Sequence, residues 1–152
     1  ELPYLNGSFD FVHQRMIGHR IPLAVWPGRV RDIYRVLRHG GLIEVVEQEI
    51  MLGNAGPRTT ELNQHMLDQL LSLAGFRDVH RQSVEVPLGS WGGPSGELAQ
   101  RAYVRMTNAM RSALLTVLPD DAALDELLAC MGEEVSEYGT FVPVHFYWAR
   151  KP

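Results

Sequence analysis

The stretch 2–49 constrains the fold most, because it reads as a turn, a strand, a helix and a second strand. Segment 9–13 is rich in aromatic and β-branched residues, which favours a strand. From about Arg29, apolar residues recur at i, i+3, i+4 and i+7, which predicts a helix ending at the glycine pair 40–41. Segment 42–46 is then almost wholly apolar, as in a strand covered on both faces. Strand, crossover helix and strand form a βαβ unit, so the two strands should lie parallel in an open α/β sheet.

The remainder of the chain predicts more strands and a helical insertion. Segment 76–87 reads as a strand, and 141–148 is apolar on both alternating faces, which is typical of an inner strand. Between these strands, at about 96–138, two helical patterns are separated by a turn in which an aspartate offers a cap for the second helix. The apolar stripe of the first of these helices comprises Leu98, Ala102, Met106, Ala109 and Ala113. An earlier helix, capped by Thr60 and ended by Gly75, should place Leu62, Met66, Leu70 and Leu73 near one face.

Composition excludes several classes of protein. The 152 residues suit one domain, and a hydrophobic content of 45% suffices for a core. A net charge of -4 with no basic run argues against a nucleic-acid or anionic-membrane surface. No apolar run approaches the roughly 20 residues that span a bilayer. The single cysteine, Cys130, cannot form an internal disulfide, which favours a reduced intracellular compartment, cytoplasmic or nuclear, and it is predicted to be buried and inert.

Three short motifs resemble the middle of a class I S-adenosylmethionine-dependent methyltransferase: 2–4 (Leu-Pro-Tyr), 8–12 (Ser-Phe-Asp-Phe-Val) and 35–41 (Arg-Val-Leu-Arg-His-Gly-Gly). In that family a Leu-Pro-Phe turn leads into a Phe-Asp-x-Val strand, and an Arg-Val-Leu-Lys-Pro-Gly-Gly helix end precedes the next strand. Arg-His replaces the usual Lys-Pro here, and the family's glycine-rich cofactor loop does not occur in the sequence. The variant with His13, Arg15, Trp26 and the closing Ala-Arg-Lys-Pro is similar to the fungal LaeA-like branch, linked to secondary metabolism.

The resemblance implies a Rossmann-like sheet whose last strand is antiparallel and lies between two others, with the helical insertion added. It implies that the chain is the C-terminal part of a single methyltransferase domain, whose first strands belong to a missing N-terminal part. S-adenosylmethionine would be the cofactor and a small organic molecule the acceptor, methylated at oxygen or nitrogen. The fragment alone should then be inactive. The alternative is a regulatory or scaffold module that acts through a protein partner without catalysis, and a homodimer is a further expectation.

Polar residues after the first strand are the first candidates for a site, because ligands bind outside the carboxyl ends of strands in open α/β sheets. The candidates for cofactor binding are His13, Gln14, Arg15 and Met16. In a continuing strand, His13 and Arg15 would share one face. Arg15 could bind the cofactor carboxylate, or it could form an ion pair with Glu47 or Asp10.

Further candidates lie beyond that segment. His19 is a candidate general base because histidine titrates near neutral pH, and Glu47, at the end of the second strand, is the other candidate for catalysis. Trp26 and Trp91 are candidates to wall a substrate pocket, although plain packing competes for Trp26. His145 stays open because its register is not fixed by the sequence. The six histidines have no metal-ligand spacing, so no metal site is expected.

Overall fold

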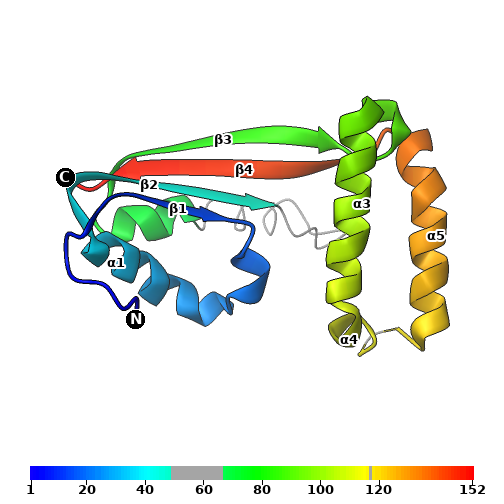
Figure 1. Ribbon diagram of the computed structural model, residues 1–152, viewed down its shortest axis with the longest axis horizontal. Coiled ribbons are helices and arrows are strands. Elements are labelled where there is room, and N and C mark those ends of the chain that lie inside the picture. The colour runs from blue at the N-terminus through cyan, green and yellow to red at the C-terminus, as the bar shows by residue number, and fades with distance from the viewer. Residues whose placement is uncertain (49–66, 117) are drawn as a thin grey trace. The chain divides into compact units, whose positions relative to one another are not determined.

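The sheet has four strands in the order β1-β2-β4-β3 in a computed structural model that describes residues 1–48, 67–116 and 118–152 (Figure 1). The strands are β1 (Phe9–Arg15), β2 (Leu37–Gln48), β3 (Arg77–Pro87) and β4 (Phe141–Arg150). β1 pairs parallel with β2, and β4 pairs antiparallel with β2. The predicted βαβ unit and the inner, antiparallel last strand are therefore confirmed. The predicted cap Thr60, with Leu62 and Met66, lies outside the described residues.

The chain divides into two units. Unit 1 comprises Glu1–Val84 and Val144–Pro152, and unit 2 comprises Glu85–Pro143. None of the described helices combines the length and the hydropathy that a bilayer-spanning segment needs.

The crossover helix α1 (Trp26–Val36) of unit 1 is displaced from its prediction at both ends. It begins at Trp26 and not near Arg29, because a proline in the first helical turn loses no hydrogen bond there. It ends before the glycine pair, because Leu37 is extended and pairs with Phe9 as the first residue of β2. The glycines predicted to end the helix thus lie inside β2, where Gly40 has a φ of 77°.

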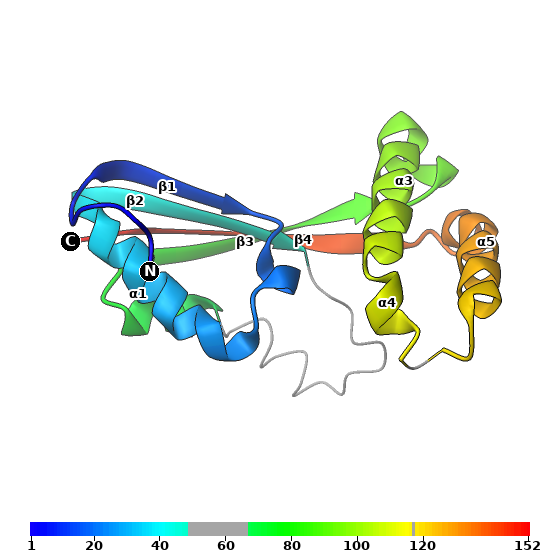
Figure 2. The same cartoon turned by 60° about the horizontal axis from the view of Figure 1, so that its bottom comes forward.

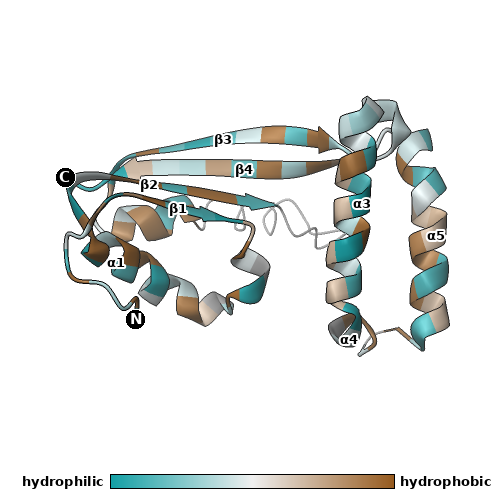
Figure 3. Cartoon of the chain, viewed as in Figure 1, coloured by the Kyte–Doolittle hydropathy of each residue, from teal (hydrophilic) through white to brown (hydrophobic). Residues whose placement is uncertain are grey.

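The core of unit 1 lies between one face of the sheet and two helices, α1 and the helical residues 67–73, which Figures 1 and 2 place on the same side. Figure 3 shows the apolar residues along α1 and the strands that form it. Within the 67–73 helix, Leu67 and Leu71 are buried, whereas Leu73 is 83% exposed. The predicted face is therefore wrong at Leu73, because positions four apart, 67 and 71, point to the sheet. The buried cluster comprises Trp26, Val30, Ile33, Leu37, Ile43, Val45, Leu67, Leu71, Phe76, Tyr147 and Ala149.

Unit 2 is mainly helical. Its elements are the 3₁₀ turn η3 (Ser90–Gly92), α3 (Gly93–Ala109), α4 (Arg111–Leu114) and α5 (Asp121–Glu137). The predicted cap is confirmed, since the Asp120 carboxylate accepts the Ala123 N–H at 2.9 Å.

The small core of unit 2 corrects two expectations. Leu88, Val135 and Val142 are buried together, and Ala99, Tyr103 and Met131 pack against them. α3 therefore turns Ala99 and Tyr103 to the core, whereas Leu98 of the predicted stripe is 62% exposed. Cys130 is exposed and not buried.

Candidate functional site

The carboxyl ends of β1 and β2 lie side by side in unit 1. The parallel register pairs Arg15 with Val46, and the Met16 N–H donates to the Val46 carbonyl at 2.8 Å. β1 is two residues longer than predicted (Phe9–Arg15 against 9–13), because its last residues find hydrogen-bonding partners on β2. The predicted neighbours at this rim, the segment after His13 and Glu47, thus do meet.

Glu47 is the centre of the contacts at this rim. Its Oε2 accepts the Gly18 N–H at 2.9 Å, and its Oε1 accepts the Ile17 N–H at 3.4 Å. Oε1 also accepts from the Gln14 side-chain amide at 3.4 Å, and the Gln14 carbonyl oxygen in turn accepts from Arg29 Nε at 3.4 Å. The carboxylate therefore receives the backbone of the turn that follows β1, just where the 3₁₀ helix η1 (Gly18–Arg20) begins.

Close packing surrounds the same turn, which we call the 16–18 turn. A Cβ added at Gly18 would lie 2.8 Å from Glu47 Oε2 and 3.4 Å from the Trp26 ring, so only glycine fits without a shift. Met16 has a φ of 52°, in the left-handed region that non-glycine residues seldom occupy. Such a conformation persists only where the surrounding contacts hold it. The 16–18 turn is thus held at Met16 by the Val46 carbonyl and at Gly18 by Glu47.

Three of the four residues proposed for cofactor binding lie in β1 and separate onto two faces of the sheet. Gln14 is buried and faces Glu47, whereas His13 and Arg15 are exposed on the opposite face, as the predicted alternation requires. His13 Nδ1 lies 2.7 Å from Glu44 Oε2. Within the described residues the Arg15 side chain has no hydrogen bond or ion pair.

The ion pairs considered for Arg15 are not formed. Asp10 pairs with Arg38 instead, and Glu47 is engaged by the 16–18 turn.

The remaining candidates lie in different surroundings. The backbone of His19 belongs to η1, and its side chain is outside the described part of the structure. Trp26 is buried in the core of unit 1, where packing accounts for its contacts. Trp91 belongs to unit 2 and is 48% exposed, with its indole N–H donating to the Thr140 carbonyl at 3.0 Å. The roles predicted for these residues in catalysis and substrate binding stay predictions.

The register of β4 resolves the open position of His145. It lies directly opposite Glu47 in the β2–β4 pair, so the two side chains share a face of the sheet. His145 is buried, and its Nδ1 lies 2.7 Å from the Ser83 hydroxyl on β3. Sequence reasoning missed two residues at this rim: Ser83, which contacts His145, and Gly18, which donates to Glu47. The available signal for Gly18 was a glycine shortly after a strand, three residues past the end of β1.

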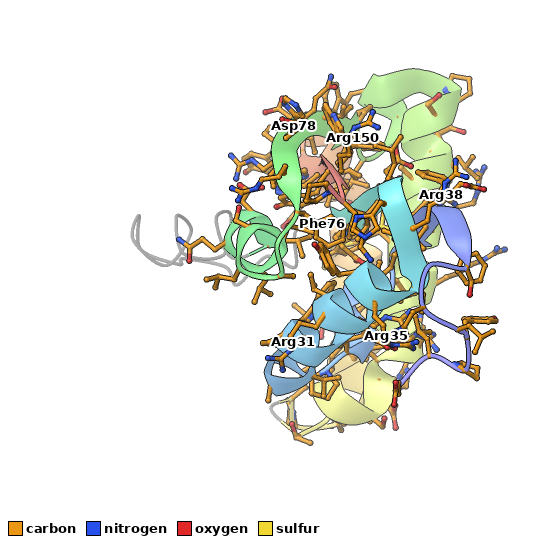
Figure 4. All side chains as sticks on the ribbon, turned by 90° about the vertical axis from the view of Figure 1, so that its left-hand side faces the viewer. Arg31, Arg35, Arg38, Phe76, Asp78 and Arg150 are labelled. Atoms are coloured by element: carbon orange, nitrogen blue, oxygen red, sulfur yellow. The ribbon has the colours of Figure 1, made fainter. Side chains whose placement is uncertain are left out.

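A second polar cluster lies at the other end of the strands, where β1 and β2 begin (Figure 4). Arg35 binds Asp32 at 2.8 Å and donates to the Leu2 carbonyl at 2.9 Å. Burial raises the pKa of Asp32, but hydrogen bonds from the Leu2 N–H and from Arg35 outweigh it and leave the pKa below its ordinary value. These contacts tie the segment before β1 to α1. Among the described residues, no group of three or more His, Cys, Asp or Glu is arranged to hold a metal ion.

No family model matches the chain, and no curated protein matches its sequence. Solved structures do match. Phosphoethanolamine N-methyltransferase 2 of Haemonchus contortus, in complex with phosphomonomethylethanolamine and S-adenosylhomocysteine, matches with a TM-score of 0.55 at 17% identity, over 98% of this chain and 35% of that one. The [4+2]-cyclase SpnF matches with a TM-score of 0.52 at 19% identity, over 100% of this chain and 53% of that one. A SAM-dependent methyltransferase of Archaeoglobus fulgidus has a TM-score of 0.50 at 13% identity, over 97% and 62% of the two chains.

At these identities the likeness concerns the fold. The chain has the Rossmann-like methyltransferase sheet, mixed and with its last strand antiparallel, and the predicted fold class is confirmed. The chain spans 35%, 53% and 62% of the length of these three proteins.

Proposed function

We propose that this chain is the C-terminal part of an S-adenosylmethionine-dependent methyltransferase that acts on a small organic acceptor at oxygen or nitrogen. The observation that supports this most is the paired rim of β1 and β2, with a fixed turn at the end of a sheet of this fold. In open α/β sheets that rim is where ligands bind. Two of the matching structures are methyltransferases, one of them with bound S-adenosylhomocysteine.

The residues at the rim fit the charges of the proposed cofactor. S-adenosylmethionine supplies an electrophilic methyl group on a sulfonium, which a nucleophile attacks in line. The carboxylate of the cofactor suits a guanidinium, and the exposed Arg15 guanidinium at the rim has no ion pair or hydrogen bond in the part of the chain that the structure describes. His19 is the proposed base for the acceptor, because its backbone lies in η1, which starts at the 16–18 turn of the rim.

The proposal that this chain is part of a larger domain rests on the share of each matching structure that it covers and on the resemblance of its sequence motifs. The chain corresponds to part of each matching structure, and β1 has one neighbour, β2, in the described sheet. We propose that preceding residues of the same polypeptide bind the ribose and much of the methionine moiety. The LaeA-like branch, an intracellular location and a homodimer belong to the same proposal and rest on the sequence.

Calorimetric titration of the full polypeptide with S-adenosylhomocysteine tests this function, followed by transfer of a labelled methyl group from S-adenosylmethionine to a panel of small hydroxyl and amine acceptors. Binding together with transfer supports the proposal. Binding without transfer favours the regulatory module. One of the matching structures is described as a [4+2]-cyclase, so this fold is not confined to proteins described as methyltransferases. Absence of binding at high protein concentration would overturn the proposal.

A further inference from the structure

We propose that Glu47 is a positioning residue, which holds the 16–18 turn in the shape that the cofactor requires, and that it is not the general base. The ligand in this inference rests on the proposed function, whereas the geometry of the turn does not. The inference starts from the direction of the hydrogen bonds. Both oxygens of the carboxylate accept N–H groups from the protein itself, at Gly18, Ile17 and Gln14.

A general base must reach the proton that it removes. The Glu47 oxygens instead face the backbone of the turn, and Gly18 approaches so closely that a Cβ there would lie 2.8 Å from Oε2 and 3.0 Å from the carboxylate carbon. The carboxylate is therefore enclosed on the side of the turn. The Glu47 carboxylate accepts the successive N–H groups of Ile17 and Gly18 at the start of η1. It thereby pairs backbone donors that have no partner within the short helix.

The conformation of Met16 supplies a second and independent observation. Its φ of 52° is unfavourable for a residue with a side chain, so contacts on either side must maintain it. One of them is the Met16 N–H to the Val46 carbonyl, and the next along the chain are those of Ile17 and Gly18 with Glu47. Glu47 thus sets where Met16, a predicted cofactor-binding residue, emerges from β1.

The experiment compares variants of both partners of this contact in the full polypeptide. Glu47→Ala removes the acceptor, Gly18→Ala forces the acceptor away, and Glu47→Gln keeps the shape with one carbonyl oxygen. Asp10→Asn is the control, because Asp10 lies near the start of β1, away from the 16–18 turn, and its exposed carboxylate pairs with Arg38. The readouts are hydrogen exchange at the Gly18 amide, the dissociation constant for S-adenosylhomocysteine, and kcat and KM for methyl transfer.

A positioning role predicts the same loss from either partner. Glu47→Ala and Gly18→Ala should each speed exchange at the Gly18 amide and weaken S-adenosylhomocysteine binding about tenfold, the effect of losing one hydrogen bond to a charged group. The double variant should be no worse than either single one, because both changes break the same contact. Glu47→Gln should show a smaller loss, with KM for the cofactor rising more than kcat falls. Asp10→Asn should match the wild type.

The opposite pattern overturns the inference. If Glu47 were the base, Glu47→Gln would lower kcat by about a hundredfold or more with cofactor affinity unchanged, and Gly18→Ala would behave as the wild type. Circular dichroism of each variant identifies any that does not fold, and the isosteric Glu47→Gln then decides. A wild type that binds no S-adenosylhomocysteine refutes the proposed function and the ligand named here. Fast Gly18 exchange in the wild type refutes the hydrogen bond itself.

Discussion

Unit 1 and unit 2 differ in the contacts that stabilise each of them internally. Unit 1 has a continuous apolar core in which residues such as Ile33, Leu37 and Leu71 are almost fully enclosed. In unit 2, by contrast, α3 contributes one buried residue, Gly96, and α5 contributes two, Leu124 and Val135. Polar contacts also join α3 and α5, since the Gln100 side-chain amide donates to the Gly132 carbonyl at 3.2 Å.

This contrast indicates where rigidity is located. The candidate site lies at the rim of the well-packed unit 1, which suits a site whose backbone N–H groups must keep fixed positions. The long helices of unit 2 bury only one and two residues, and regions with few buried apolar contacts open locally at low free energy. Four changes test the contrast.

The largest effect is expected from the core of unit 1. Leu71→Ala should destabilise the protein by about 2–5 kcal/mol, because it removes buried methyl groups and leaves a cavity. Leu73→Ala, in the same helical segment but at an 83% exposed position, should change stability by less than about 0.5 kcal/mol. Urea denaturation of both variants measures the difference. Equal effects would mean that the helix does not face the sheet as described.

A smaller effect is expected from the glycine turn of unit 2. Gly89 has a φ of 95°, and a Cβ there would overlap the Ser136 hydroxyl, whose oxygen accepts the Ser90 N–H at 2.8 Å. Gly89→Ala should therefore destabilise unit 2 by about 1–3 kcal/mol. Gly132→Ala, inside α5 and with no neighbour closer than 3.6 Å, should be neutral or stabilise by up to about 1 kcal/mol.

Hydrogen exchange resolved by segment provides the readout for the two glycine variants. The Gly89→Ala variant should lose protection within 85–143 and keep it in the sheet core of unit 1. A loss of protection spread equally over both units would contradict the separation of their stabilities.

The sequence predicted the features that burial determines and missed those that depend on pairing between distant strands. Apolar periodicity identified the βαβ unit, and alternation on both faces identified β4 as an inner strand, because burial shapes composition directly. The end of α1 was missed, because the pairing of Leu37 with Phe9 outweighs the local signal of the glycine pair. Propensity acts locally, whereas pairing depends on a residue far along the chain.

The candidate site shows the same division. The rim itself was predicted, because parallel strands bring their carboxyl ends together. That Glu47 accepts the Gly18 N–H could not be predicted, because the two residues are 29 positions apart and their contact depends on the register of two strands. The Ser83–His145 pair, 62 positions apart, was missed for the same reason.

An intermediate effect with a defined pH dependence is expected at Asp32. Because the folded state holds the Asp32 pKa below its ordinary value of 3.8, the carboxylate stabilises the fold above that pH and ceases to do so as pH falls through the lower folded pKa. Asp32→Asn should cost on the order of 1 kcal/mol at neutral pH, and the difference from the wild type should shrink below pH 3.8. Asp10→Asn, which breaks an exposed pair with Arg38, should cost less than about 0.5 kcal/mol. A constant difference at all pH values would contradict the role of the Asp32 charge.

The smallest effect is expected at Arg111, the residue that joins α4 to the first turns of α5. Its guanidinium donates to Asp125, to Asp121 at 2.6 Å and to Asn108 at 2.8 Å, and the hydrogen bonds to Asp125 and then Asp121 raise its pKa. These groups are exposed, so salt screens their attraction. Arg111→Gln should speed amide exchange at Ala123 at low ionic strength, and the difference from the wild type should fade at about 1 M salt.

Arg105→Gln is the control for this change, since the Arg105 side chain on α3 forms no ion pair or hydrogen bond within the described residues, and it should not alter exchange in α5. A loss of stability at Arg111 that rivals Leu71→Ala and persists in high salt would mean that an apolar contact, and not charge, closes this end of unit 2. The contrast between the two units would then have to be redrawn.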